Sequence, residues 1–210
     1  MVPALWAILK FTSFNKGSKF LVWLVLLSSI VNLIAHYLLH HTESKVNVHY
    51  FNFFAIAQFV LFNRLYFAVL KKPVWKKALN ILLLLVLAFT VLNWIFLQPF
   101  MTRFNTNVIC VGNISYVLFS LLYFSQLLNS EKYHNLMDDW AFWLSAGLLL
   151  YNSSAFVLFL MTNYLYDYSP DVYKASNRLN AIFNIVLTGF YLVSLFVAAK
   201  RYNLSQVDDA

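Results

Sequence analysis

Four histidines surround one connection between two apolar segments, and their side chains are able to bind a metal ion or a haem. His36 and His40 are four residues apart, so they share one face of a helix. His41 adjoins them, and His49 opens the next apolar segment. Neutral imidazoles are common ligands of transition metals and of haem iron. One interpretation of this spacing is a metal or haem site formed by His36, His40 and His49.

The same histidines have a second interpretation that needs no cofactor. At the edge of an apolar segment, imidazole rings also contact lipid headgroups and water. A metal site moreover requires further side chains that hydrogen-bond to its ligands and orient them, and Glu43 is the one acid near this cluster. We therefore expect no resident cofactor, and we keep a metal or a haem as the alternative.

No aspartate or glutamate lies in the middle of an apolar segment, since all eight acids fall in polar stretches or at segment ends. Proton-coupled transporters and intramembrane proteases commonly use a buried carboxylate. The sequence also lacks the Gly-x-Ser-x-Gly and His-Glu-x-x-His motifs and a phosphate-binding glycine loop. Because no acid–base pair is placed for chemistry, we predict that the protein is not an enzyme.

Uncharged polar side chains recur inside the apolar segments, where each of them is costly. A polar cavity that binds a ligand is one interpretation, and hydrogen bonds between helices, worth about 0.6–2 kcal/mol each, are the other. Arg64 either extends to the membrane interface or holds an anionic ligand or lipid headgroup. The candidate ligand-binding residues are Gln58, Asn63, Arg64, Asn113, Asn152, Asn180 and Asn184.

Long apolar segments carry these residues, and the composition indicates that they cross a membrane. Of 210 residues, 61% are hydrophobic and 11% are charged, which leaves too few charges to cover a water-soluble domain. A spanning helix needs about 17–25 residues. We predict one all-α polytopic transmembrane helix bundle over residues 1–210. Its expected spans are 20–39, 50–70, 78–97, 106–128, 139–164 and 178–199, preceded by a shorter apolar segment, 2–14, which we count as a seventh helix.

A basic stretch at 71–77 sets the expected orientation, because short lysine-rich loops stay on the cytoplasmic side of a membrane. It contains four lysines in seven residues. With this stretch inside, the same side holds five further basic residues, against four on the other side. We therefore expect a bacterial inner membrane protein with a cytoplasmic C-terminus. The net charge of +7 falls mainly in these turns, so we expect no nucleic-acid partner.

Three aromatic and aliphatic stretches carry a resemblance to known proteins: ISYVLFSLLYF at 114–124, WAFWLSAGLLLY at 140–151 and NFFAIAQF at 52–59. In these stretches the sequence resembles a family of small multi-pass membrane proteins of Bacteroidota-type bacteria, which are often encoded beside sensor histidine kinases. More distantly, it is similar to the membrane half of bacterial seven-transmembrane signalling receptors. The resemblance implies signalling through a separate partner, because the chain carries no signalling module of its own, and it implies no catalytic residues.

These features lead to three functional hypotheses. The first is a sensory or accessory module in the lipid bilayer, which binds a small apolar or lipid-like ligand and signals through a separate membrane protein such as a sensor kinase. The second is a small-solute carrier or permease that uses the asparagine-rich faces as its path. The third is a metal- or haem-binding membrane protein built on the histidine cluster.

Overall fold

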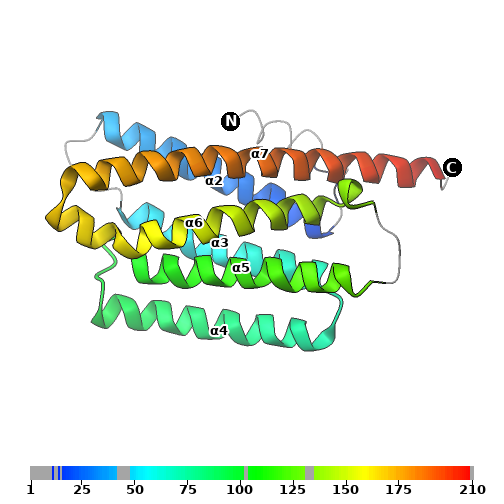
Figure 1. The fold of residues 1–210 in the computed structure, drawn as a ribbon, viewed down its shortest axis with the longest axis horizontal. Helices are drawn as coiled ribbons and strands as arrows, with labels where there is room; N and C mark the ends of the chain where they lie inside the picture. The colour runs from blue at the N-terminus through cyan, green and yellow to red at the C-terminus, as the bar shows by residue number, and fades with distance from the viewer. Residues whose placement is uncertain are drawn as a thin grey trace.

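The computed structural model of the chain describes residues 11, 14, 16–41, 48–101, 104–130 and 135–208. Within these residues the regular structure is helical and no strand is formed. This confirms the predicted all-α transmembrane helix bundle (Figure 1). Its helices include α2 (Lys16–His41), α3 (Val48–Val69), α4 (Pro73–Phe96), α5 (Thr106–Leu128), the short 3₁₀ helix η2 (Leu136–Asp138), α6 (Trp140–Tyr168) and α7 (Pro170–Asp208).

Each long helix in the described part of the chain contains a segment with the length and apolar composition of a membrane span. These segments overlap the six spans expected from the sequence, because a helical run of about 20 apolar residues just crosses the hydrocarbon core. The seventh helix, expected at 2–14, falls outside the described residues except for Phe11 and Phe14. The six segments are Gly17–Ile34, His49–Val69, Pro73–Phe96, Thr106–Leu128, Trp140–Thr162 and Asp171–Lys200.

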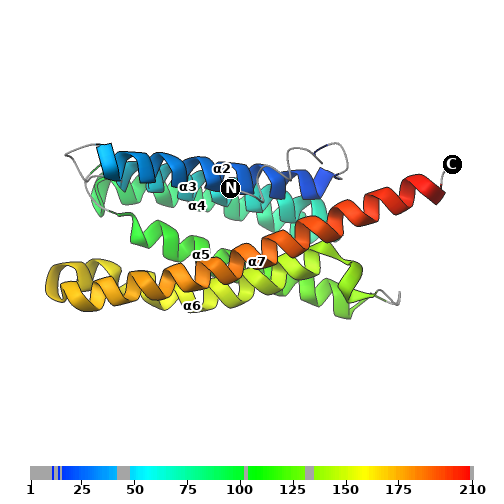
Figure 2. The same ribbon diagram turned by 90° about the horizontal axis from the view of Figure 1, so that it is seen from above.

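Successive helices run antiparallel, and they form two layers that meet mainly through α5. Figure 2 shows α2, α3 and α4 in one layer, α6 and α7 in the other, and α5 between them. The most extensive packing joins α6 to α7 and α5 to α6. Half of the α5 span is buried, the largest share among these spans, as expected for a helix with neighbours on both sides.

The basic residues sort to the two ends of the bundle as the topology prediction requires. One end, on the right in Figure 1, holds the start of α2, the α3–α4 turn, the α5–α6 connection and the C-terminal part of α7. That this lysine-rich end faces the cytoplasm stays a prediction. Among the described side chains, this end carries Lys19, Lys71, Lys72, Lys76, Lys77 and Lys200, and the other end carries Lys174 and Arg178.

The turn between α3 and α4 is shorter than expected. α4 begins at Pro73 rather than near residue 78, so Leu70, Lys71 and Lys72 alone separate the two helices. Proline is favoured in the first turn of a helix, because its fixed φ suits the helix and its missing N–H would be unpaired there. The Gln126 side chain of α5 accepts a hydrogen bond from the backbone N–H of Lys71 at 2.6 Å, which ties the turn to a third helix.

The polar stretch 166–177, which lies between the expected spans 139–164 and 178–199, is helical apart from Ser169. α6 continues to Tyr168 and α7 begins at Pro170, with Ser169 alone between them. Pro170 begins α7, since proline is favoured in the first turn of a helix. Aromatic packing accompanies this extension, since the rings of Tyr166 and Tyr173 meet edge to face with centroids 5.3 Å apart.

The close packing of α6 against α7 depends on a glycine. A methyl group at Gly147 would lie 2.5 Å from Cβ of Phe190 and 2.7 Å from its Cγ. Carbon atoms do not approach so closely, so the small residue is what lets the two helices pack at this distance. Ser194 of α7 adds a hydrogen bond from its hydroxyl to the backbone oxygen of Trp140 at 2.7 Å. α6 and α7 therefore form a tight helical pair.

Amide side chains fix the connection between α4 and α5. Asn52 of α3 donates to the backbone oxygen of Phe100 at 2.8 Å and accepts from the backbone N–H of Asn105 at 3.0 Å. Gln98 donates to the hydroxyl of Thr106 at 3.0 Å. Because buried polar groups are costly without partners, these bonds hold the connection against α3 and close the end of the bundle opposite the lysines.

Candidate functional site in the bundle interior

A chain of hydroxyl groups links three helices inside the bundle. Tyr66 of α3 is fully buried, and its hydroxyl lies 2.8 Å from Ser145 Oγ on α6 and 3.3 Å from Ser120 Oγ on α5. Ser120 donates its own proton to the backbone oxygen of Tyr116 at 2.9 Å. A consistent arrangement is therefore that Ser145 donates to Tyr66 and Tyr66 donates to Ser120. We call Tyr66, Ser120 and Ser145 the Tyr66 joint.

A fourth helix brings a hydroxyl to the same region without a hydrogen bond. Tyr191 of α7 is buried, and its hydroxyl has no hydrogen-bond partner among the described residues. Tyr191 belongs to the same buried cluster as Tyr66 and Tyr116. Because an unpaired buried hydroxyl costs about 1–3 kcal/mol, a small shift of α7 that gives Tyr191 a partner would recover part of this energy.

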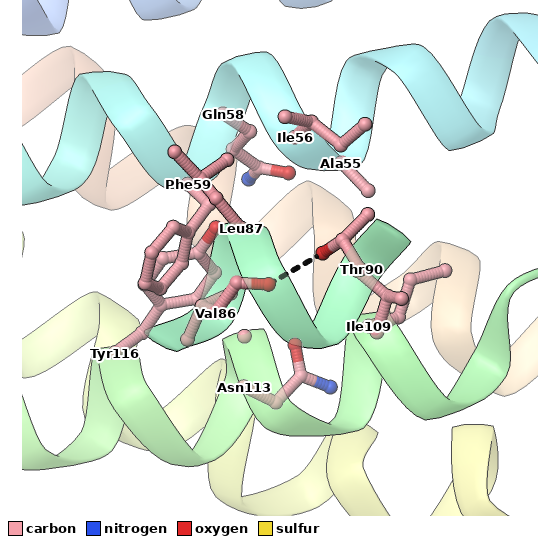
Figure 3. A pocket seen from close by; sticks show the side chains of 12 residues that line it. Ala55, Ile56, Gln58, Phe59, Val86, Leu87, Thr90, Ile109, Asn113 and Tyr116 are labelled. Atoms are coloured by element: carbon pink, nitrogen blue, oxygen red, sulfur yellow. Dashed lines mark hydrogen bonds between the residues drawn. The ribbon is translucent and has the colours of Figure 1, made fainter. Parts of the chain in front are cut away.

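A cavity of about 40 Å³ lies between α3, α4 and α5. Figure 3 shows the amides of Gln58 and Asn113 and the hydroxyl of Thr90 pointing into it. Thr90 donates its proton to the backbone oxygen of Val86 at 2.7 Å, which leaves its oxygen as an acceptor. Asn113 Nδ2 is buried and has no partner within the described part of the chain. The cavity therefore offers both a donor and acceptors to a guest molecule.

The size of this cavity limits what it can hold. A buried water needs roughly 10–15 Å³ of such space, so a volume of about 40 Å³ admits a few waters or one small hydrogen-bonding molecule. Sites for drug-sized ligands measure about 300–1,000 Å³. Tyr116 lines the cavity and also accepts the bond from Ser120, so the cavity and the Tyr66 joint meet at this residue.

Two of the seven predicted ligand-binding residues, Gln58 and Asn113, come together in the cavity. Asn63 is directed to another contact: its amide donates to a backbone oxygen of α4 at 2.8 Å, and its Oδ1 has no partner among the described residues. Arg64 lies at the outer surface, where its Nη1 donates to Asn80 Oδ1 at 3.4 Å. Neither of them lines the cavity.

The remaining three candidates form bonds within and between helices. Asn152 and Asn184 donate to the backbone oxygens of the residues four positions earlier, Leu148 at 2.7 Å and Asn180 at 3.2 Å. Asn180 Oδ1 accepts from the hydroxyl of Tyr151 at 3.2 Å, which links α6 to α7. The polar residues of α6 and α7 thus agree with the interpretation as interhelical and intrahelical hydrogen bonds.

The side chains of His36 and His40 lie outside the described part of the structure, so the metal or haem site stays a prediction. His49 is half-buried near the start of α3, and its ring packs against Tyr50 with centroids 4.1 Å apart. Among the described residues, no group of three or more histidine, cysteine, aspartate or glutamate side chains is placed to hold a metal ion.

The outer face of α7 carries small and polar residues in the middle of its span. A shallow, open groove of about 430 Å³, which we call the α7 groove, is lined by Asn184, Ile185, Thr188, Gly189 and Leu192. A methyl group at Gly189 would meet no atom within 4 Å, so internal packing does not require this glycine. Small residues next to polar side chains are typical of surfaces where membrane helices associate.

The tyrosines of the interior were missed by the sequence analysis. Tyr116, Tyr151 and Tyr191 lie well inside their spans, whereas tyrosines of an aromatic belt lie at the membrane interfaces. This depth was an available signal, since a buried tyrosine hydroxyl usually needs a partner. Tyr66 gave no such signal, because it lies near the end of α3, where an interfacial tyrosine is also expected.

The fold and the interior define a class of protein: a polytopic α-helical membrane bundle with a polar, tyrosine-lined interior. Helices α3, α5, α6 and α7 supply that interior. No protein-family model matches the chain, and neither a curated protein nor a solved structure matches it.

Proposed function

We propose that the protein is an integral membrane sensory or accessory module that passes a shift of α7 to a separate membrane partner. The observation that carries the proposal is the unpaired hydroxyl of Tyr191, in the buried cluster that also contains Tyr66. A sensory element needs two arrangements of similar energy. In the arrangement of the structure, the hydroxyls of the Tyr66 joint are hydrogen-bonded to one another and the Tyr191 hydroxyl is unpaired. In the second arrangement, the Tyr191 hydroxyl forms a hydrogen bond and the joint loses one of its own.

The two arrangements are expected to differ little in free energy. A hydrogen bond between membrane helices contributes about 0.6–2 kcal/mol, and an unpaired buried hydroxyl costs about 1–3 kcal/mol. The bond lost at the joint and the bond gained by Tyr191 therefore offset each other to within roughly 2 kcal/mol. A ligand or partner with modest differential affinity shifts a balance of this size.

α7 is suited to carry the shift out of the bilayer. Its 39 residues correspond to about 58 Å at 1.5 Å per residue, compared with a hydrocarbon core of about 30 Å. The helix is continuous from Pro170 to Asp208, so a displacement at Tyr191 also moves its C-terminal part. Figures 1 and 2 show this part extending beyond the other helices.

The α7 groove is the surface that we assign to the partner. Asn184 and Thr188 expose polar atoms within an apolar span, and Gly189 allows another helix to approach closely. The expected partner is therefore a transmembrane helix of another protein. A sensor kinase is the candidate that the family resemblance suggests.

The proposed input is a small hydrogen-bonding molecule in the cavity at Asn113, in place of the apolar or lipid-like ligand expected from the sequence. The small volume and the polar groups of the cavity favour this ligand class. A molecule that accepts a hydrogen bond from Asn113 Nδ2 would pair this buried donor. Its presence would act on Ser120 through Tyr116, which borders the cavity.

Distances between two spin labels test the shift. The single Cys110 is replaced by alanine, and labels are placed at Val74 and Lys200, which are exposed at the same end of the bundle. In lipid nanodiscs we expect two distance populations, and a single population in Tyr191→Phe, because the second arrangement loses the hydrogen bond that stabilises it. One identical population in both proteins would contradict the proposed shift.

Photo-crosslinking in the membranes of the native host tests the partner. A photoreactive residue at Ile185, in the α7 groove, is compared with one at Leu84 on α4; the two side chains are 72% and 69% exposed. We expect a specific protein adduct from Ile185 and its loss when Gly189→Leu fills the groove. Adducts of equal yield from both positions would indicate random collisions and count against docking at α7.

The carrier hypothesis and the metal- or haem-binding hypothesis predict different experimental results. A carrier needs a continuous polar path, whereas Asn152 and Asn184 bond to their own helices. Solute uptake by proteoliposomes that disappears in Asn113→Leu would favour a carrier over our proposal. A haem absorbance band that disappears in His36→Ala would favour the third hypothesis.

A further inference from the structure

A basic patch on the α3–α4 hairpin contains two cations, Arg64 and Lys76, and each has one weak contact with another side chain. Arg64 lies inside the apolar segment of α3 and is exposed at its outer surface. A guanidinium has several N–H donors, and that of Arg64 makes one long hydrogen bond, to Asn80 Oδ1 at 3.4 Å. Lys76 of α4 reaches across the same hairpin, with its Nζ 5.3 Å from the ring centroid of Phe67 on α3.

Helical spacing places these two cations on one strip of the surface. Phe67 follows Arg64 by three residues on α3, and Asn80 follows Lys76 by four residues on α4, so each pair shares a helix face. The two cross-helix contacts therefore lie one helical turn apart, about 5.4 Å, along the groove between α3 and α4. Arg64 and Lys76 therefore lie along the same groove, about one helical turn apart.

The patch lacks a compensating carboxylate within the described part of the chain. The ion pair in the described part of the chain joins Lys174 to Asp171 at the start of α7. The α3–α4 turn, which carries the patch, is at the other end of the bundle (Figure 1). A charged side chain within an apolar span is costly unless it reaches the interface or meets an opposite charge. An anion supplied from outside the protein would lower this cost for Arg64.

We propose that Arg64 and Lys76 bind the phosphate of an anionic phospholipid. Arg64 lies within the membrane-crossing segment, where a lipid rather than a dissolved ion supplies the phosphate. The planar guanidinium can donate two parallel hydrogen bonds to phosphate oxygens, while Lys76 acts as a point charge. An acyl chain lies against Leu84, which is exposed further along α4 on the face that carries Lys76 and Asn80. This site does not depend on the signalling role of α7.

Asn80 is a positioning residue in this site. Its Oδ1 accepts the hydrogen bond from Arg64, which holds the long side chain across the groove, one helical turn from Lys76. Without this contact the guanidinium is free to leave the groove. Asn80→Leu is therefore expected to weaken lipid binding less than Arg64→Gln, because the charge itself remains.

Native mass spectrometry of the full-length protein in neutral detergent tests the site by lipid titration. The probes are phosphatidylglycerol and, as a zwitterionic control, phosphatidylcholine. Arg64→Gln and Lys76→Gln are each expected to weaken phosphatidylglycerol binding about fivefold, because each removes a charge-assisted hydrogen bond to the phosphate. Lys77→Gln is the matched control, since it removes the same charge from the next position of α4, which is exposed on another face. Its effect should stay below about twofold, because Lys77 makes no direct contact with a phosphate held between Arg64 and Lys76.

Two results would overturn the proposal. An equal loss of binding in all three glutamine variants would mean that the basic end attracts anionic lipids without a defined site. Equal binding of phosphatidylglycerol and phosphatidylcholine by the unmodified protein would mean that the charge of the lipid is not recognised. If Arg64→Gln does not fold, Lys76→Gln and Lys77→Gln still decide the outcome, because both side chains lie at the end of the hairpin.

Discussion

Removing the hydroxyl group from two buried tyrosines should have opposite effects on the stability of the bundle. Tyr66→Phe and Tyr191→Phe delete the same atom from two rings that are both buried. The Tyr66 hydroxyl has partners 2.8 Å and 3.3 Å away on α6 and α5. The Tyr191 hydroxyl has none among the described residues. Comparing the two variants therefore separates the free energy that a hydrogen bond contributes from the free energy that an unpaired polar atom costs.

The expected magnitudes follow from these contacts. Tyr66→Phe leaves the Ser145 hydroxyl, which is fully buried, without the bond it forms to Tyr66. We expect the free energy of unfolding to fall by about 1–2 kcal/mol, near the upper limit for hydrogen bonds between membrane helices. Tyr191→Phe removes an unpaired hydroxyl from an apolar surrounding, so stability should stay constant or rise by up to about 1 kcal/mol.

Equilibrium unfolding in mixed lipid–detergent micelles measures both changes, and a double-mutant cycle localises the first. Ser145→Ala should cost nearly as much as Tyr66→Phe, and the double variant should cost little more than either, because both remove the same bond. Additive losses from Tyr66→Phe and Ser145→Ala would refute the joint. A loss in Tyr191→Phe as large as in Tyr66→Phe would show that Tyr191 is hydrogen-bonded, and would remove the basis of the proposed shift of α7.

Other substitutions probe the packing, the α4–α5 connection and the cavity. Gly147→Ala should destabilise the bundle by about 1–3 kcal/mol in the same unfolding assay, because the new methyl collides with Phe190; Gly189→Ala, which meets nothing within 4 Å, should not. Asn52→Leu breaks two hydrogen bonds to the α4–α5 connection and should speed hydrogen exchange there, leaving the α6–α7 turn unchanged. Asn113→Leu should preserve or raise stability by filling the cavity and removing an unpaired donor, whereas a loss above about 1 kcal/mol would mean that the amide is paired.

The membrane spans could be predicted from the sequence because the bilayer imposes one simple requirement. A run of about 20 apolar residues is needed to cross the core, and the long helices of the described chain meet this requirement. Helix ends outside the bilayer are not subject to it. The helical stretch around Pro170 and the early start of α4 at Pro73 were therefore misplaced, since a proline both ends helices and begins them.

The candidate site could be predicted in part. Gln58 and Asn113 stand out in the sequence as polar residues within apolar spans, but their meeting in one cavity depends on the rotation of α3 and α5 about their axes. The spans are apolar on nearly all sides, so no amphipathic pattern sets that rotation. Tyr66 and Tyr191 were overlooked for a different reason: tyrosine is partly apolar, and its hydroxyl matters only when the ring is buried away from the interface.

The asparagines of this bundle show why residue type alone does not identify a site in a membrane. An asparagine amide has both a donor and an acceptor, and the backbone oxygen four residues earlier can satisfy only the donor. Asn152 and Asn184 each make that bond to their own helix. Asn113 leaves its donor unpaired beside a cavity, an arrangement that costs stability and that packing does not require. In a bilayer, where no water compensates such an atom, an unpaired group facing a cavity is a better marker of function than the presence of an asparagine.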